Sequence, residues 1–253
     1  AMTTNRVTGM LTGVLITALI QSSSATTVMV VSFVNAGLLT LTQSIGVIMG
    51  ANIGTTVTAW IISTLGFKID ISAFALPLLA FAIPLFFSNK SSRKSIGEFI
   101  FGFSFLFMGL EGLKNNAPDL SANPDMLAFV QNYTDMGFFS ILLFLFVGAI
   151  LTMIVQASAA TMAITLIMCA NGWIDYHLGV ALVLGENIGT TITANFAALT
   201  GNTQARRAAL AHLMFNVFGV IWVLVLFYPF TAAVSWFVTS IMKITDPSVA
   251  ISF

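Results

Sequence analysis

The polar residues of this 253-residue chain that could do chemistry gather in two short stretches. The first reads QSSSATT over Gln21–Thr27, and the second reads QASAAT over Gln156–Thr161, 135 residues further along the chain. Both contain hydroxyl and amide groups, and apolar runs flank both of them. Polar side chains between such runs are costly in a membrane, so they normally face a cavity or a protein partner. We therefore expect both stretches to contribute to one binding site.

A second pair of motifs repeats with the same offset. GANIGTT at Gly50–Thr56 matches GENIGTT at Gly185–Thr191. Between positions 13 and 59, 15 of 47 residues are identical to the residue 135 positions later. Composition alone would produce only a few such identities, so the chain contains an internal repeat.

The composition indicates a membrane protein. The chain is 58% hydrophobic and 7% charged, whereas a soluble domain has about 25% charged residues. Its apolar runs are continuous and contain small residues, which is typical of packed membrane helices. A net charge of zero gives no indication of nucleic acid binding, and the single cysteine, Cys169, excludes an intramolecular disulfide and a multi-cysteine metal site. We therefore predict an all-α polytopic membrane protein.

The elements that must position the polar motifs are expected in two copies. We predict a first repeat over residues 1–113 and a second, inverted repeat over residues 138–253, separated by an extracellular linker at 114–137. The first repeat comprises a re-entrant hairpin at 7–34, a broken transmembrane helix at 41–65, and helices at 71–87 and 96–113. The second comprises a hairpin at 138–170, a broken helix at 177–200, and helices at 205–227 and 230–244.

Length and charge favour hairpins over single crossings. The 28 residues of 7–34 would span roughly 42 Å as a helix, which is too short for two crossings and a turn. With hairpins, seven of the nine basic residues lie on one side of the membrane, and only Lys68 and Lys114 lie on the other. The positive-inside rule then places the N-terminus and both basic loops in the cytoplasm. Three crossings follow each hairpin, so the second copy is inverted, as in many secondary transporters.

The motifs predict a site for an anion and cations together. A helix break leaves carbonyl groups unpaired on one side and amides on the other. Carbonyl, asparagine and threonine oxygens suit a hard cation such as Na⁺, and amides at a helix N-terminus favour an anion. All nine basic residues map to helix ends or loops, so cations must balance the anion's charge. Such coupled binding is typical of a symporter, and we find no nucleophile–base constellation that would indicate an enzyme.

The paired motifs, together with the stretch Ala208–Gly219, resemble the type II sodium–phosphate cotransporter family, including its bacterial members. The similarity covers most of the chain. It implies Na⁺-driven transport of inorganic phosphate across the plasma or bacterial inner membrane, with Na⁺ as the coupling ion and no organic cofactor. The implied phosphate residues are Gln21, Ser22, Ser23, Ser24, Gln156 and Ser158. The implied Na⁺ residues are Asn52, Thr55, Thr56, Asn187, Thr190 and Thr191, and we place Thr26, Thr161 and Glu186 with them.

The chain departs from the family pattern in three ways. The second polar stretch has alanine at two serine positions, and Glu186 stands where the first copy has Ala51. Relatives often have a helix before the first hairpin and a C-terminal regulatory domain, and we expect this chain to lack that helix, by truncation or by nature. His212 and Asn216 lie four residues apart on one helix face. They could reach the core site, but we expect them to form hydrogen bonds between helices instead.

Other functions stay open. The same chemistry would serve a symporter for a dicarboxylate or sulfate, and only the resemblance favours phosphate. An uncoupled exporter or channel, or a sensor that keeps the fold without transporting, are further alternatives. Analogy with such transporters also suggests a homodimer.

Overall fold

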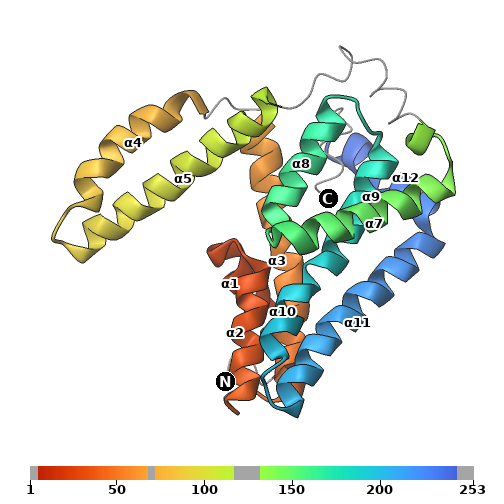
Figure 1. Ribbon diagram of the computed structural model, residues 1–253, viewed down its shortest axis with the longest axis horizontal. Helices are drawn as coiled ribbons and strands as arrows, with labels where there is room; N and C mark the ends of the chain where they lie inside the picture. The colour runs from red at the N-terminus through yellow and green to blue at the C-terminus, as the bar shows by residue number, and fades with distance from the viewer. Residues whose placement is uncertain (1–4, 68–71, 117–131, 244–253) are drawn as a thin grey trace. The chain divides into compact units, whose positions relative to one another are not determined.

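The computed structural model describes residues 5–67, 72–116 and 132–243, and every regular element among them is a helix (Figure 1). The chain forms two compact units, one of residues 1–60 with 123–253 and one of residues 61–122. Most of the predicted linker at 114–137 lies outside the described residues.

The first polar stretch forms the turn of a helical pair. Helix α1 (Arg6–Ile20) is capped at its C-terminus by Gln21, and α2 (Ser23–Asn35) begins after one further residue, Ser22. Gln21 has left-handed backbone angles (φ 58°, ψ 28°), and its Nε2 donates to the carbonyl of Ala18 at 2.6 Å. Ser22 caps α2, because its Oγ accepts from the amide of Ala25 at 3.2 Å. The predicted hairpin at 7–34 is therefore two helices joined by a two-residue turn.

The second stretch forms the same turn. Helix α7 (Phe138–Val155) ends at Gln156, which has φ 54° and ψ 22°, and α8 (Ser158–Ala170) follows. Ala157 stands where Ser22 stands in the first copy, and its side chain cannot cap the helix. The chain then continues through α9 (Tyr176–Gly189), α10 (Thr191–Ala198), α11 (Thr203–Val225), α12 (Phe227–Trp236) and a π-helical turn at Phe237–Ile241.

Glycines allow two pairs of helices, α1 with α3 and α7 with α9, to cross with their backbones in direct contact. A Cβ atom added at Gly50, on α3 (Leu41–Phe67), would overlap the carbonyl oxygen of Met10 on α1. A Cβ atom added at Gly185 would overlap the carbonyl oxygen of Leu145 on α7, which is the residue 135 positions after Met10. The sequence repeat is thus a repeat of packing, because α1 crosses α3 in the register in which α7 crosses α9.

The prediction of two broken helices is wrong for the first copy. Helix α3 runs without a break through the whole GANIGTT motif. In the second copy the helix is interrupted only at Thr190, whose backbone angles stay helical (φ −57°, ψ −28°). The motif glycines serve close helix crossing rather than a change of backbone direction, because none of them has a positive φ. The hydroxyl groups of Thr55 and Thr56 donate to carbonyls one turn back, at 3.1 and 2.8 Å.

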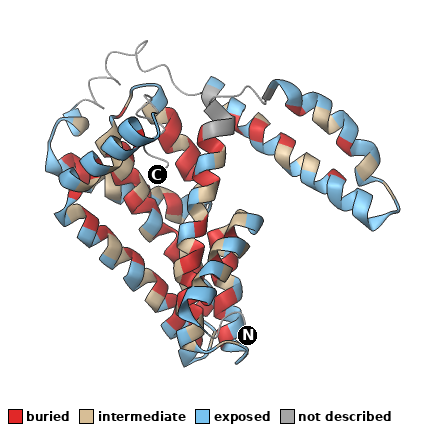
Figure 2. Ribbon diagram, turned by 180° about the vertical axis from the view of Figure 1, so that it is seen from behind, coloured by how far each residue is buried: buried red, intermediate tan, exposed pale blue. Residues whose placement is uncertain are grey.

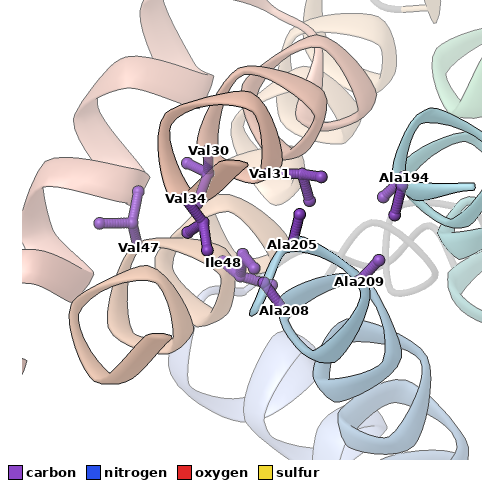
Figure 3. Close-up of a cluster of buried hydrophobic side chains, with 10 residues drawn as sticks. Val30, Val31, Val34, Val47, Ile48, Ala194, Ala205, Ala208 and Ala209 are labelled. Carbon is purple, nitrogen blue, oxygen red and sulfur yellow. The ribbon is translucent and has the colours of Figure 1, made fainter. Parts of the chain in front are cut away.

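A buried core joins the two copies (Figure 3). Valines of α2 and α3 pack there against alanines of α10 and α11, so the hairpin of the first copy lies on helices of the second. The connection continues at the end of α2, where the amide of Asn202 donates to Oδ1 of Asn35 at 2.7 Å and its side chain donates to the carbonyl of Asn35 at 2.9 Å. The core residues are Val30, Val31, Val34, Val47, Ile48, Ala194, Ala198, Ala205, Ala208 and Ala209.

Four helices among the described residues are long and apolar enough to cross a membrane: Leu41–Ser63, Ser91–Leu113, Phe138–Val155 and Thr203–Val225. Helix α1 is too short, since its 15 residues span roughly 22 Å. Helix α7, with 18 residues, is long enough to cross alone, which the hairpin prediction did not anticipate. Helices α1, α7 and α11 have buried residues along one side and exposed large apolar residues along the other, and the burial colours of Figure 2 show how buried and exposed residues alternate along the helices.

The smaller unit contains α4 (Ser72–Phe86) and α5 (Ser91–Asn115), which pack along each other (Figure 1). Gly97 allows this contact, because a Cβ atom there would lie 2.5 Å from the amide nitrogen of Phe86. Helix α5 begins five residues before the predicted start at 96. Its first turns are polar, and Lys94 and Glu98 lie 3.9 Å apart, one turn from each other.

Candidate functional site

A cavity of about 410 Å³ lies in the larger unit among α3, α9, α11 and α12, with Met162 of α8 in its wall. Both GxNIGTT motifs contribute to it, so two segments far apart in the sequence meet at one place. Most of the wall is apolar. The side chains in the wall that carry hydrogen-bonding groups are Asn52, Thr55, Thr56, Tyr176, Glu186, Asn187, Asn216 and Trp222.

Glu186 is the acidic residue of this cavity. Its side chain is 3% exposed, and its Oε2 has no hydrogen-bond partner among the described residues. Among the described residues, no lysine or arginine lines the cavity. A buried carboxylate without a partner is strongly unfavourable unless a proton or a cation joins it. The cavity therefore requires either a proton on Glu186 or a cation beside it.

Asn52 lies at the junction of α3 and α11. Its Nδ2 donates to Oδ1 of Asn216 at 3.0 Å, and its Oδ1 lies 3.1 Å from Nε2 of His212. His212 is fully buried. These contacts confirm the expectation that His212 and Asn216 form hydrogen bonds between helices. Their i, i+4 spacing was the only signal in the sequence, and it did not identify Asn52 as the partner.

The hairpin turns do not reach the lining of this cavity. Gln21, Ser22 and Ser24 are half-buried at the first turn, and Gln156 is exposed at the second, where Ser158 is half-buried. Ser23 differs from them, because it is 3% exposed and its Oγ has no hydrogen-bond partner among the described residues. It lies in the first turn of α2, where amides have no acceptor within the helix and the helix dipole favours an anion. This turn supplies donors of the kind that bind an oxyanion.

The remaining predicted Na⁺ residues are threonines that lie within helix packing. None of them lines the cavity. Where their hydroxyls have partners they donate to backbone carbonyls, as Thr26 does to Ser22 at 3.0 Å and Thr191 does to Ile188 at 2.7 Å. All of them are buried: Thr26, Thr161, Thr190 and Thr191. The structure thus divides the predicted ion residues into a cavity group and a packing group.

Comparison with known proteins agrees with the motifs. The sequence pattern of a family described as Na⁺/Pi-cotransporter matches residues 1–115 and 121–243. The uncharacterized protein YqeW of Bacillus subtilis is 32% identical over 94% of this chain and 73% of its own length. No solved structure matches the chain.

Two further relatives have names that state a function. The Escherichia coli protein named "Putative inorganic phosphate export protein YjbB" is 33% identical over 84% of this chain and 38% of its own length. The sodium-dependent phosphate transport protein 2A of Ovis aries is 49% identical over 63 residues, which are 25% of this chain and 10% of that protein. The chain therefore spans less than half the length of these two relatives.

Proposed function

Because this chain belongs to the Na⁺/Pi-cotransporter family, we propose that it is a secondary transporter that couples Na⁺ to inorganic phosphate across the plasma or bacterial inner membrane. The observation that carries this proposal is the cavity to which both repeated motifs contribute. There Glu186 is buried, its Oε2 has no hydrogen-bond partner among the described residues, and amide and hydroxyl oxygens from α3 and α9 line the same cavity. Such a set of oxygens suits Na⁺, a hard cation. The sodium-dependent phosphate transport protein from sheep supports this choice of ions.

Na⁺ binds in the cavity in this proposal. Glu186 supplies the charge, and neutral oxygens of Asn52, Thr55, Thr56 and Asn187 complete the coordination. The buried threonines of the packing group could offer Na⁺ at most one oxygen lone pair each. Three of them already donate their hydroxyl proton to a backbone carbonyl. They serve further ions only if the helices move. That group is Thr26, Thr161, Thr190 and Thr191.

Phosphate binds at the hairpin turns. Ser23 is the central donor, because its hydroxyl is buried and has no hydrogen-bond partner in the described part of the chain. The amides of the first turns of α2 and α8 add neutral donors, and the other predicted phosphate residues surround them: Gln21, Ser22, Ser24, Gln156 and Ser158. In the described part of the chain no basic side chain forms a hydrogen bond at either turn, so bound Na⁺ compensates the charge of the phosphate. Each ligand then binds weakly without the other, which is the coupling that a symporter needs.

The proposed arrangement in the bilayer is an inverted repeat. The pairs α1–α2 and α7–α8 re-enter the membrane, and the basic residues near Lys90 and Arg206 face the cytoplasm with the N-terminus. Equal helix crossings in both copies support the repeat. A homodimer in the lipid bilayer is part of this proposal by analogy alone.

A second candidate is phosphate export without Na⁺ coupling. It is favoured by the name of the Escherichia coli relative, which matches 84% of this chain. In that case Glu186 would carry a proton, or bind a cation that does not drive transport.

Uptake of ³²P-phosphate into proteoliposomes tests the proposal, with an inward Na⁺ gradient in one sample and choline in its place in the other. We expect uptake that depends on the gradient and that sulfate and succinate do not compete away. Equal uptake in both samples would favour the uncoupled exporter. Uptake that succinate or sulfate abolishes would replace phosphate by another anion.

A further inference from the structure

We propose that His212 and Asn216, here called the α11 clamp, hold the side chain of Asn52 in one orientation and so preset an oxygen of the cation site. This inference rests on the proposed function, because it assigns positioning residues to the proposed Na⁺ site. It extends that site to a residue, His212, that does not line the cavity.

The direction of the hydrogen bonds follows from one backbone carbonyl. Nδ2 of Asn216 donates to the carbonyl of His212 at 2.9 Å, which turns Oδ1 of Asn216 toward Asn52. Nδ2 of Asn52 must be the donor to that oxygen. Oδ1 of Asn52 therefore faces Nε2 of His212 at 3.1 Å, and this nitrogen must carry the proton, since an oxygen can only accept.

The second ring nitrogen of His212 supports the tautomer in which Nε2 carries the proton. Nδ1 of His212 is buried and has no partner among the described residues. A neutral imidazole has one donor nitrogen and one acceptor nitrogen. The donor is used on Asn52, and the acceptor is the atom that is left unpaired. The imidazole is thus arranged for one contact, the one with Asn52.

A held asparagine is a better ligand than a free one. Asn52 and Asn216 both line the cavity, while His212 lies behind them with no exposed surface. The clamp uses one lone pair of the Asn52 oxygen and fixes the position of the other. A cation that binds this oxygen does not have to order the side chain first, and preorganisation of that kind raises affinity.

The clamp exists in one copy only. The residues 135 positions before His212 and Asn216 are Pro77 and Phe81, whose side chains have no hydrogen-bonding group. Asn187, the counterpart of Asn52, has no hydrogen bond to any described side chain and lies next to Glu186. One repeat therefore contributes a positioned neutral oxygen, and the other contributes the charge.

The test uses His212→Leu, which removes the donor, and His212→Gln, which restores an N–H group of similar reach. The readout is the Na⁺ concentration that gives half of the Na⁺-dependent rise in the unfolding temperature of the purified full chain, with choline as the ionic control. Ligand-linked stabilisation reports this binding without requiring transport. His177→Gln is the matched control, because His177, at the start of α9, packs beside Phe227 and Tyr228 and does not itself line the cavity.

We expect His212→Leu to raise that Na⁺ concentration by roughly tenfold or more, His212→Gln to recover most of the loss, and His177→Gln to have no effect. In an Asn52→Ala background, His212→Leu should cause no further change, because the clamp acts only through Asn52. The inference is overturned if His212→Leu lowers the unfolding temperature while its Na⁺ dependence stays the same, or if its effect persists without Asn52. A wild-type chain that does not respond to Na⁺ at all would overturn the proposed function, and the clamp with it.

Discussion

Thr17 and Thr26 are joined by a hydrogen bond inside the first helical hairpin, where Oγ1 of Thr17 donates to Oγ1 of Thr26 at 3.1 Å. Oγ1 of Thr26 in turn donates a hydrogen bond to the carbonyl of Ser22 at 3.0 Å. The second hairpin has threonines at both equivalent positions, but Thr152 donates instead to the carbonyl of Gly148 on its own helix, at 2.8 Å. The first turn is therefore tied to α1 by a chain of hydroxyl groups that the second turn lacks.

This difference predicts unequal effects of one substitution in the two copies. Thr17→Val keeps the shape of the side chain and removes the donor to Thr26, and we expect a loss of about 1 kcal/mol in the free energy of unfolding. Thr152→Val removes only a bond within its own helix and should cost less. Unfolding in detergent measures both, with the exposed Thr239→Val as the control. Equal losses at the two positions would contradict the prediction.

The glycine crossings make a prediction about packing. Gly50→Ala and Gly185→Ala place a methyl group onto a carbonyl of the crossing helix, so the helices must separate. Overpacking of this kind typically costs about 1–3 kcal/mol, and we expect each variant to reach the upper part of that range. Gly219→Ala is the control, because nothing lies within 4 Å of the added Cβ atom. Thermal unfolding followed by size exclusion would show the difference, and two stable variants would refute the backbone contact.

The same glycines explain what the sequence could and could not predict. The offset of 135 residues identified the repeat, and the apolar runs around the QSSSATT and QASAAT stretches identified the two helical pairs. Glycine, however, permits either a broken helix or a close crossing, and local sequence does not separate the two. Contacts that are distant in sequence decide between these two structures. The carbonyl groups of Met10 and Leu145 lie against Gly50 and Gly185, and this favours the close crossing.

The candidate site was predicted in part for a similar reason. Asn52 and Glu186 were identified by their place in the motifs, and the structure brings both into one cavity. The partner of Asn52 could not be predicted, because His212 is 160 residues away and no pattern links the two. Conversely, Thr161 and Thr191 also belong to the repeated motifs but lie within helix packing, since their hydroxyls donate to backbone carbonyls three or four residues back.

The phosphate site can be tested at Ser23. Its buried hydroxyl has no hydrogen-bond partner among the residues that the structure describes, so Ser23→Ala should leave the fold intact and remove a donor to phosphate. A hydrogen bond to a charged group contributes about 1.5–3 kcal/mol, which corresponds to a rise of roughly tenfold to a hundredfold in the phosphate concentration for half-maximal uptake. Ser32→Ala is the matched control on the same helix, because Ser32 is exposed and donates to the carbonyl of Val28. Unchanged phosphate dependence in Ser23→Ala would remove Ser23 from the site.

Glu186 decides whether the cavity binds a cation. Glu186→Gln keeps the size of the side chain and removes the charge that Na⁺ would balance, so we expect the Na⁺ concentration for half-maximal phosphate uptake to rise by roughly tenfold or more. The phosphate dependence at saturating Na⁺ should change little, because the carboxylate lies in the cavity and not at the hairpin turns. Glu98→Gln is the control, since Glu98 is an exposed residue of α5 paired with Lys94. If phosphate uptake by Glu186→Gln depends on Na⁺ concentration as uptake by the wild type does, the carboxyl group binds a proton instead, and the coupling ion must bind elsewhere. If the variant transports phosphate without any need for Na⁺, Glu186 is the residue that makes the cation obligatory, and its negative charge is what the empty transporter must neutralise before it can move.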